Sequence, residues 1–284
     1  MSVLTLPSPL VTAEWLQVNF HYPELIILDA SWFMPNTNRD GKLEWFEARI
    51  PGAIYFDFDR EICAHHSDLP HMMPNAADFQ TSVRHLGVNQ NSIIVIYDTL
   101  GIFSSPRVWW MFKVMGFNNV AVLDGGLPAW QKRDLAIENG PQKDPITEGD
   151  FVANYQSHLI CNADEVLQAT EDEKQAILDA RSANRFYAKE AEPRAGVRSG
   201  HIPNSKNLPV ADIIKDQKMQ DAYQLALIFE AIAPKNKRVI FSCGSGVTAC
   251  ILALAATLAG YQDLSVYDGS WSEWGSRDDL PVVS

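Results

Sequence analysis

Residues 238–248 of this 284-residue chain read Arg-Val-Ile-Phe-Ser-Cys-Gly-Ser-Gly-Val-Thr. An apolar run at 239–241 leads into Cys243, and an alanine- and leucine-rich helical pattern begins at Thr248. This order predicts a buried strand, a glycine-containing turn and a helix, which together form the repeating unit of a parallel α/β sheet. Ligands bind beyond the carboxyl ends of the strands in such sheets. We therefore expect catalytic or ligand-binding residues in the turn after residue 242.

Cys243 opens this turn and is a candidate nucleophile. A thiol at the end of a strand and before a helix lies among inward-pointing backbone N–H groups, near the positive end of a helix dipole. Both effects favour the thiolate, which is the reactive form. A buried, inert cysteine would need no flanking turn residues, whereas glycines are expected where a ligand approaches the backbone closely. The sequence favours the nucleophile.

The chain repeats one order of elements. The runs 25–30, 50–53, 93–98 and 120–126 are followed in the second half by 176–180, 201–203, 238–243 and 264–269, and the same offset separates Asp124 from Asp268 and Trp130 from Trp274. Helical patterns at 105–115 and 223–233 alternate with the apolar runs. We expect two α/β domains, 1–145 and 146–284, each a mainly parallel sheet with helices on both faces. The Gly- and Pro-containing stretch 138–155 is the expected linker.

Bulk composition narrows the class of protein. A formal net charge of −12 argues against nucleic acid or an anionic membrane as partner, because both would require a basic face. The amino-terminal stretch lacks a basic and apolar leader pattern, and no apolar run nears the roughly 18 residues of a membrane span. Cysteines 63, 161, 243 and 250 have no paired spacing, so neither a metal site nor a disulfide framework is expected. We expect a cytoplasmic protein with reduced thiols.

Several motifs together resemble the tandem-domain rhodanese family of sulfurtransferases, over nearly the whole chain. They are Asp-Ala-Arg at 179–181, Gly-His-Ile-Pro at 200–203, the Cys243 loop and Tyr-Asp-Gly-Ser-Trp-Ser-Glu-Trp at 267–274. The loop Cys-Gly-Ser-Gly-Val-Thr is similar to that of members acting on 3-mercaptopyruvate, whereas thiosulfate-using relatives carry basic residues after the cysteine. Thiosulfate is a compact dianion that favours Arg or Lys beside the thiolate, and Gly244 and Ser245 are neutral.

The resemblance implies a sulfur-transfer reaction through a Cys243 persulfide. Sulfur would come from 3-mercaptopyruvate and pass to a thiol acceptor, such as thioredoxin or a small thiol, or to cyanide, with pyruvate released. The implied enzyme is a monomer without cofactor or metal. Loop residues would contact the substrate and stabilise the anionic persulfide through their N–H groups; they are Gly244, Gly246, Val247 and Thr248. In the first half Asp98 stands in the place of Cys243, so only the second domain is expected to do covalent chemistry.

Two arginines are singled out by the resemblance as the pair that holds the substrate carboxylate and keto oxygen. These are Arg185 and Arg194. The planar guanidinium suits the task because it binds a carboxylate through two parallel hydrogen bonds and stays charged. Most charges in a segment such as 181–198 are solvated surface pairs, and we expect Arg181 and Arg198 to matter little.

The resemblance also implies a proton relay of Ser245, His71 and Asp59. A hydroxyl within reach of an imidazole that a carboxylate orients can move a proton at neutral pH. Asp57 competes with Asp59 for the last place, because the spacing to the histidine is one residue longer than the family pattern. Cys250, on the helical pattern after the loop, is expected to face the core.

Three other functions compete with this interpretation. A thiosulfate sulfurtransferase would use the same cysteine, and a non-enzymatic sulfur-carrier or regulatory module would be favoured only if Cys243 were replaced. A cysteine phosphatase requires Cys-x5-Arg, and the sixth residue after Cys243 is Ala249. The arginine that would hold phosphate is therefore missing.

Overall fold

The computed structural model describes residues 4–143 and 145–284, which form two compact units. Unit 1 contains the described residues up to His65 together with Pro74–Tyr155 and Asp216–Met219. Unit 2 contains His66–Met73, Gln156–Lys215 and Gln220–Ser284. Each unit thus includes one short segment from the other half of the chain. Sequence periodicity alone did not predict this exchange.

The sheet of unit 1 has five strands in the order β1-β5-β4-β2-β3, and each neighbouring pair is parallel. The strands are β1 (Leu10–Val11), β2 (Leu25–Asp29), β3 (Ile54–Tyr55), β4 (Ile93–Tyr97) and β5 (Val120–Leu123). The helices are α1 (Ala13–Asn19), α2 (Gly41–Glu47), α3 (Ala76–His85), α4 (Ser105–Val114) and α5 (Gly126–Gln131), with a 3-10 turn η1 at Pro35–Thr37. Every residue of β4 is buried, as expected for a central strand covered on both faces.

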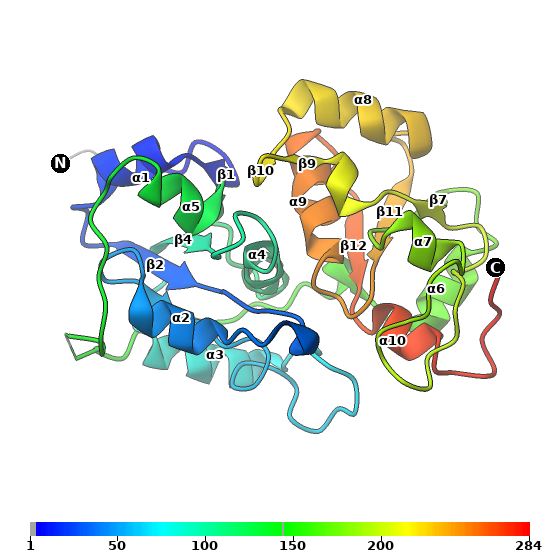
Figure 1. Ribbon diagram of the computed structural model, residues 1–284, viewed down its shortest axis with the longest axis horizontal. Helices are drawn as coiled ribbons and strands as arrows, with labels where there is room; N and C mark the ends of the chain where they lie inside the picture. The colour runs from blue at the N-terminus through cyan, green and yellow to red at the C-terminus, as the bar shows by residue number, and fades with distance from the viewer. Residues whose placement is uncertain (1–3, 144) are drawn as a thin grey trace. The chain divides into compact units, whose positions relative to one another are not determined.

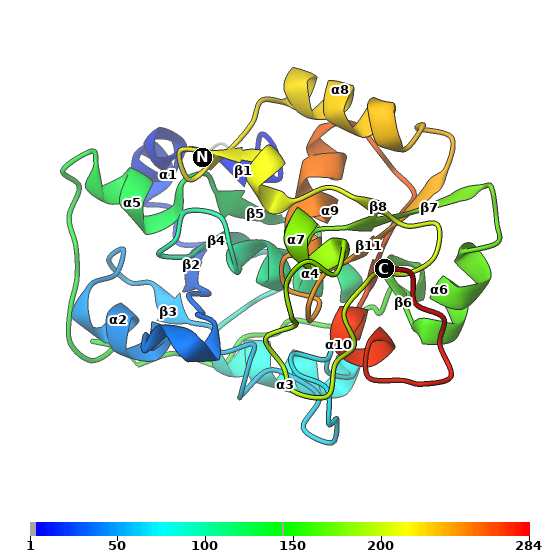
Figure 2. The same ribbon diagram turned by 45° about the vertical axis from the view of Figure 1, so that its right-hand side comes forward.

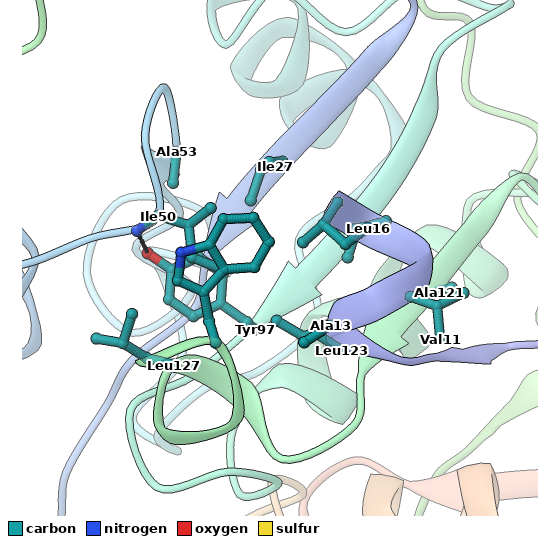
Figure 3. Packing of buried hydrophobic residues seen from close by; sticks show 12 residues of the cluster. Val11, Ala13, Leu16, Ile27, Ile50, Ala53, Tyr97, Ala121, Leu123 and Leu127 are labelled. Atoms are coloured by element: carbon teal, nitrogen blue, oxygen red, sulfur yellow. Dashed lines mark hydrogen bonds between the residues drawn. The ribbon is translucent and has the colours of Figure 1, made fainter. Parts of the chain in front are cut away.

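Apolar side chains cover both faces of this sheet. On one face Leu16 of α1 and Leu127 of α5 pack with Ile27 and other alternate strand residues (Figure 3). Trp130 belongs to the same cluster. The hydroxyl of Tyr97 accepts a hydrogen bond from the backbone N–H of Ile50 within this cluster, at 3.3 Å (Figure 3). On the opposite face, buried aromatic rings from α3, α4 and neighbouring loops contact one another; they are Phe56, Phe79, Phe112, Phe117 and Phe151.

Unit 2 repeats the topology, with five parallel strands in the order β6-β12-β11-β7-β8. They are β6 (Ile160–Cys161), β7 (Gln175–Asp179), β8 (Lys206–Asn207), β11 (Arg238–Ser242) and β12 (Leu264–Tyr267). The helices are α6 (Ala163–Ala169), α7 (Ala183–Phe186), α8 (Ala222–Ile232), α9 (Ala249–Leu258) and α10 (Ser270–Trp274), with 3-10 turns η2 (Ser157–Leu159) and η3 (Val210–Asp212). Unit 2 also contains the short strand β9 (Ile214–Lys215), and the short strand β10 (Lys218–Met219) lies in the segment that belongs to unit 1.

The helices of unit 2 lie on both sides of its sheet. Figures 1 and 2 show α8 and α9 on one side and α6 and α10 on the other. Ala163 and Val166 of α6 pack with Trp271 and Trp274 of α10 in one buried cluster. The predicted fold, two α/β domains with parallel sheets covered on both faces, is confirmed.

Local sequence explains where the longer helices begin. Asn75 caps α3 by accepting from the N–H of Asp78, and Asp221 caps α8 by accepting from the N–H of Gln224. A side-chain acceptor at this position satisfies an N–H that has no partner inside the helix. The helix predicted at 223–233 begins after this Asp221 cap, and the helix predicted at 105–115 begins without a side-chain cap but with Pro106 in its first turn. Both appear within about one residue of their expected bounds.

The stretch predicted as linker is held mainly by unit 1. Backbone N–H groups of Gly149, Phe151 and Asn154 donate to carbonyls of that unit. At the start of the stretch, the fully buried Arg49 pairs with Glu138 at 2.7 Å and donates to the carbonyl of Gly140. The main boundary between the two units along the chain accordingly lies between residues 155 and 156, ten positions beyond the domain boundary expected at 145.

Within residues 4–143 and 145–284, no helix combines the length and the apolar character that crossing a membrane requires.

Candidate active site in unit 2

The loop that begins with Cys243 lies between β11 and α9, as the sequence predicts. Cys243 is buried, with 1% of its surface exposed. Its backbone N–H donates to the hydroxyl of Ser270 at 3.1 Å, and its sulfur lies 3.9 Å from the same hydroxyl oxygen. Gly246 has a φ of +76°, a conformation that side chains other than glycine adopt at a cost. The glycine at 246 therefore allows the loop to turn from strand to helix.

Residues at the start of α10 satisfy the carbonyl groups of the loop. The N–H of Trp271 donates to the carbonyl of Cys243 at 3.0 Å. Both the N–H and the hydroxyl of Ser272 donate to the carbonyl of Gly244, at 2.8 and 2.6 Å. Because these bonds tie the loop to a buried helix, the backbone around the thiol is preorganised.

Arg185 lies against Gly244, and Arg194 is linked to Gly244 through Ser272. A Cβ built on Gly244 would lie 3.1 Å from Nη2 of Arg185, so the guanidinium lies directly against the backbone next to the nucleophile. Arg194 donates to the hydroxyl of Ser272 at 3.1 Å, the same hydroxyl that contacts the carbonyl of Gly244. One cationic group thus lies against the residue after Cys243, and a second is linked to that residue through Ser272.

Glu192 fixes the orientation of Arg185. Its carboxylate, 4% exposed, accepts from Nε of Arg185 at 3.2 Å and from Nη2 on the same edge of the guanidinium. Burial acts to lower the pKa of Arg185, but the hydrogen bond and charge of Glu192, and to a smaller degree the Cys243 side chain, raise it above its ordinary value. Arg185 therefore remains a cation in this environment.

Arg181 and Arg198 are not the solvated residues that we expected. The side chain of Arg181 is fully buried, pairs with Asp179 at 2.7 Å and Glu192 at 2.8 Å, and lies over the ring of Trp271. Arg198 donates to four backbone carbonyls, those of Trp274, Gly275, Arg277 and Leu280. The expectation that both are solvated is wrong, because Arg181 is fully buried and Arg198 is half-buried and held by backbone carbonyls. That their substitution has little effect on catalysis stays a prediction.

The relay candidates are divided between the units. His71 is 4% exposed with a φ of +61° and belongs to unit 2, as does the buried Ser245. Asp59 belongs to unit 1 and is half-buried. The carboxylate of Asp57 accepts from the N–H groups of Asp59 and Arg60, at 3.2 and 2.9 Å, and thereby closes a turn. Burial raises the pKa of Asp57 above its ordinary value, although these bonds oppose the shift.

The remaining loop residues have mainly structural contacts. Val247 is buried and Thr248 is half-exposed at the amino end of α9. Cys250 is fully buried, and its thiol lies 3.3 Å from the carbonyl of Gly246, which agrees with the expected core position. All four cysteines are free thiols.

Sequence reasoning missed Ser270, Ser272 and Glu192. The motif at 267–274 was recognised, but no role was assigned to its hydroxyl groups. The duplication carried a usable signal in the sequence, because Ser270 corresponds to Gly126. In the structure both residues have positive φ values, +47° and +51°. A serine where the other copy has glycine suggests that a hydroxyl is needed there.

Comparisons with known proteins identify the family of this chain. The family model described as "Rhodanese-like domain" matches residues 12–133 and 162–277. The 3-mercaptopyruvate sulfurtransferase of Escherichia coli K12 is 39% identical over 274 residues, 96% of each chain, and that of Rattus norvegicus is 38% identical over 277 residues, covering 94% of this chain and 92% of the other. The crystal structure of SseA from Escherichia coli superposes with a TM-score of 0.84 at 36% identity, covering 93% of this chain and 99% of that one. The chain therefore belongs to the rhodanese family of sulfurtransferases, with two copies of the family's domain in tandem.

Proposed function

We propose that this protein moves sulfur from 3-mercaptopyruvate to an acceptor through a persulfide on Cys243. The observation that carries the choice of donor is a pair of arginines beside the Cys243 loop, Arg185 against Gly244 and Arg194 on Ser272, while the loop has no cationic residue of its own. A substrate whose carboxylate and keto oxygen lie apart from its sulfur fits separated guanidinium groups beside the thiol. The relatives named for this substrate support the same choice.

In the first half-reaction the Cys243 thiolate attacks the thiol sulfur of the substrate. A sulfur–sulfur bond forms, the carbon–sulfur bond breaks, and its electron pair leaves as the enolate of pyruvate. The proton of the substrate thiol is transferred to the enolate carbon, which gives pyruvate and an anionic persulfide. Arg185 and Arg194 would hold the carboxylate and keto oxygen, and so stabilise the enolate as its charge develops.

The proton transfer is assigned to Ser245, His71 and Asp59. Ser245 is the second residue after the nucleophile, and His71 belongs to the same unit despite its distance in sequence. We favour Asp59 over Asp57 as the carboxylate that orients His71, because Asp57 is already the acceptor for two N–H groups of its turn. A carboxylate oxygen that already closes its own turn is less available to orient an imidazole.

In the second half-reaction an acceptor removes the outer sulfur. Cyanide would leave as thiocyanate and restore the Cys243 thiolate, and a thiol such as thioredoxin or a small thiol would leave as its persulfide. We propose a monomeric, cytoplasmic protein that acts without cofactor or metal. The four free thiols support a reducing compartment.

Intact-mass analysis and steady-state rates test the proposal together. After 3-mercaptopyruvate the protein is expected to gain about 32 Da, one sulfur, at the thiolate. Cys243→Ser should neither gain this mass nor turn over. Thiosulfate, tested on the same preparation, should give the lower catalytic efficiency. A higher efficiency with thiosulfate would establish the alternative donor, and mass gain in Cys243→Ser would exclude the proposed nucleophile.

A further inference from the structure

We propose that Asp268 is a positioning residue that holds the segment His66–Met73, and with it His71, on the unit that carries Cys243. Asp268 follows β12 directly and is 4% exposed. Its Oδ2 accepts a hydrogen bond from the backbone N–H of Met73 at 2.6 Å. Met73 ends the exchanged segment and is two residues after His71. This inference rests on the proposed function, because it assumes that His71 moves the proton.

Unit 1 contains the same arrangement with different side chains. Asp124, the duplicate of Asp268, accepts from the N–H of Met219 at 3.0 Å. Met219 ends the other exchanged segment, Asp216–Met219. Gln217 stands two residues before Met219, as His71 stands before Met73, and both have left-handed backbones, with φ values of +65° and +61°. Each half of the chain therefore uses one aspartate to hold a segment from the other half.

The equivalent segment in unit 1 packs on an identifiable loop. A Cβ built on Gly101 would lie 2.5 Å from the carbonyl oxygen of Gln217, so this residue packs on the loop after Asp98. Gly101 is the third residue after Asp98, and Gly246 is the third after Cys243; both have positive φ values. The correspondence points to the loop of the nucleophile as the place to which Asp268 brings His71.

The connection after β12 contacts both the segment that carries His71 and the backbone of Cys243. Asp268 holds the segment of His71, and Ser270, two residues later, holds the backbone N–H of Cys243. A charged acceptor forms a stronger hydrogen bond than a neutral one. Since a displacement of about 1 Å in a reacting group can cost roughly a hundredfold in rate, one short, buried connection can set the distance between acid–base group and nucleophile.

Measuring the two half-reactions separately distinguishes a positioning role of Asp268 from a general loss of stability. In Asp268→Ala, persulfide formation from 3-mercaptopyruvate, followed by rapid-quench mass analysis, should slow roughly ten- to a hundredfold. Removal of the outer sulfur from the preloaded persulfide by cyanide requires no proton transfer and should be unchanged. Asp268→Asn keeps an oxygen acceptor and should recover most of the rate. Asp124→Ala, the matched control, removes the same bond in unit 1 and should leave both half-reactions unaltered.

A double-mutant cycle with His71 tests the route of the effect. His71→Ala with Asp268→Ala should be no slower in persulfide formation than His71→Ala alone, because both changes remove one function. Additive losses, an equal loss in Asp124→Ala, or full activity in Asp268→Ala would overturn the positioning role while leaving the reaction intact. Full activity in His71→Ala would instead overturn the relay of the proposed function, and the inference with it.

Discussion

Glu192 binds one edge of the Arg185 guanidinium and so determines which of its N–H groups face Gly244. Glu192 occupies the Nε edge, which leaves Nη1 and the second hydrogen of Nη2 for a substrate beside Gly244. A lysine keeps the charge but cannot keep this division, because its ammonium group is a point charge on a flexible stem. We therefore predict that positive charge alone is insufficient at position 185.

Arg185→Lys is expected to lower kcat/KM with 3-mercaptopyruvate about ten- to a hundredfold, the equivalent of one hydrogen bond to a charged group. Arg277→Lys is the control, since Arg277 is exposed and pairs with the exposed Asp279. The measurement is the steady-state rate over a range of substrate concentrations. An unchanged kcat/KM in Arg185→Lys would show that only the field of a positive charge is needed.

Ser270 has a left-handed backbone conformation, which is unfavourable for serine, and a hydroxyl that contacts the backbone of Cys243. Its φ of +47° costs about 1 kcal/mol or more in a residue with a side chain. The hydroxyl donates to the carbonyl of Tyr267 at 2.8 Å and accepts from the N–H of Cys243. Backbone strain at a buried position beside the nucleophile is explained if this hydroxyl orients the thiol.

Two substitutions at Ser270 separate strain from function. Ser270→Gly and Ser270→Ala both remove the hydroxyl and should slow persulfide formation to the same degree. Urea unfolding should show the glycine variant more stable than the alanine variant by about 1 kcal/mol, because only glycine relieves the left-handed backbone. Wild-type rates of persulfide formation in Ser270→Gly would contradict the role of the hydroxyl.

Asp29 is the duplicate of Asp179, but its sequence neighbourhood lacks the arginine that follows Asp179. In unit 2 Asp179 has Arg181 as its partner, whereas unit 1 has Ser31 in the corresponding place. Burial raises the pKa of Asp29 to about 6, although hydrogen bonds from Ser31 and Tyr97 oppose the shift. The folded state thus favours the neutral acid, and the contribution of Asp29 to stability falls as the pH rises from about 4 through 6.

Asp29→Asn should remove this pH dependence. The amide oxygen can still accept from the N–H of Ser31, which donates to Oδ1 of Asp29 at 2.8 Å. The free energy of unfolding at pH 7.5 should rise, by about 3 kcal/mol at most for a shift of two pH units. Urea unfolding at pH 4 and pH 7.5 measures the difference. A variant that is less stable than the wild type at pH 7.5 would show that the carboxylate is favourably charged in the fold.

At the scale of elements, strands and helices followed from local pattern, but the exchanged segments did not. The apolar run before Cys243 and the turn glycines marked β11 and its loop. By contrast, Met73 and Met219 are held by single hydrogen bonds to distant aspartates. A bond between a backbone N–H and a side chain far along the chain leaves no periodicity in either segment.

The candidate site shows the same division. Cys243 and its loop could be predicted because a nucleophile after a buried strand needs particular neighbours. The arginines were chosen by resemblance, and their local sequence could not show that Arg181 is buried while Arg185 reaches Gly244. A side chain's burial depends on what the rest of the fold places over it. Acidic partners such as Glu192 become recognisable only once the helices are in place.

At the scale of the whole molecule, duplication has produced one reactive loop and one closed loop. In unit 1 the carboxylate of Asp98 fills its own loop. Its Oδ2 accepts from the N–H groups of Phe103, Ser104 and Ser105 at 2.8, 3.1 and 2.9 Å, and Oδ1 accepts from that of Leu100 at 3.0 Å. The N–H groups that could surround an anion are thus occupied by a side chain of the protein itself.

Asp98→Cys is therefore expected to stay inert toward the sulfur donor. The substituted thiol would lack a counterpart of Ser270, where unit 1 has Gly126, and a counterpart of Arg181, where it has Ser31. Losing the carboxylate also leaves buried N–H groups without acceptors, each costing about 1–3 kcal/mol, so lower stability toward urea is expected. Intact-mass analysis after 3-mercaptopyruvate should show one added sulfur, and Asp98→Cys combined with Cys243→Ser should show none. Sulfur located at position 98 by peptide mapping would mean that a cysteine at the end of this strand is sufficient, and that the groups around Cys243 are not what confines the chemistry to unit 2.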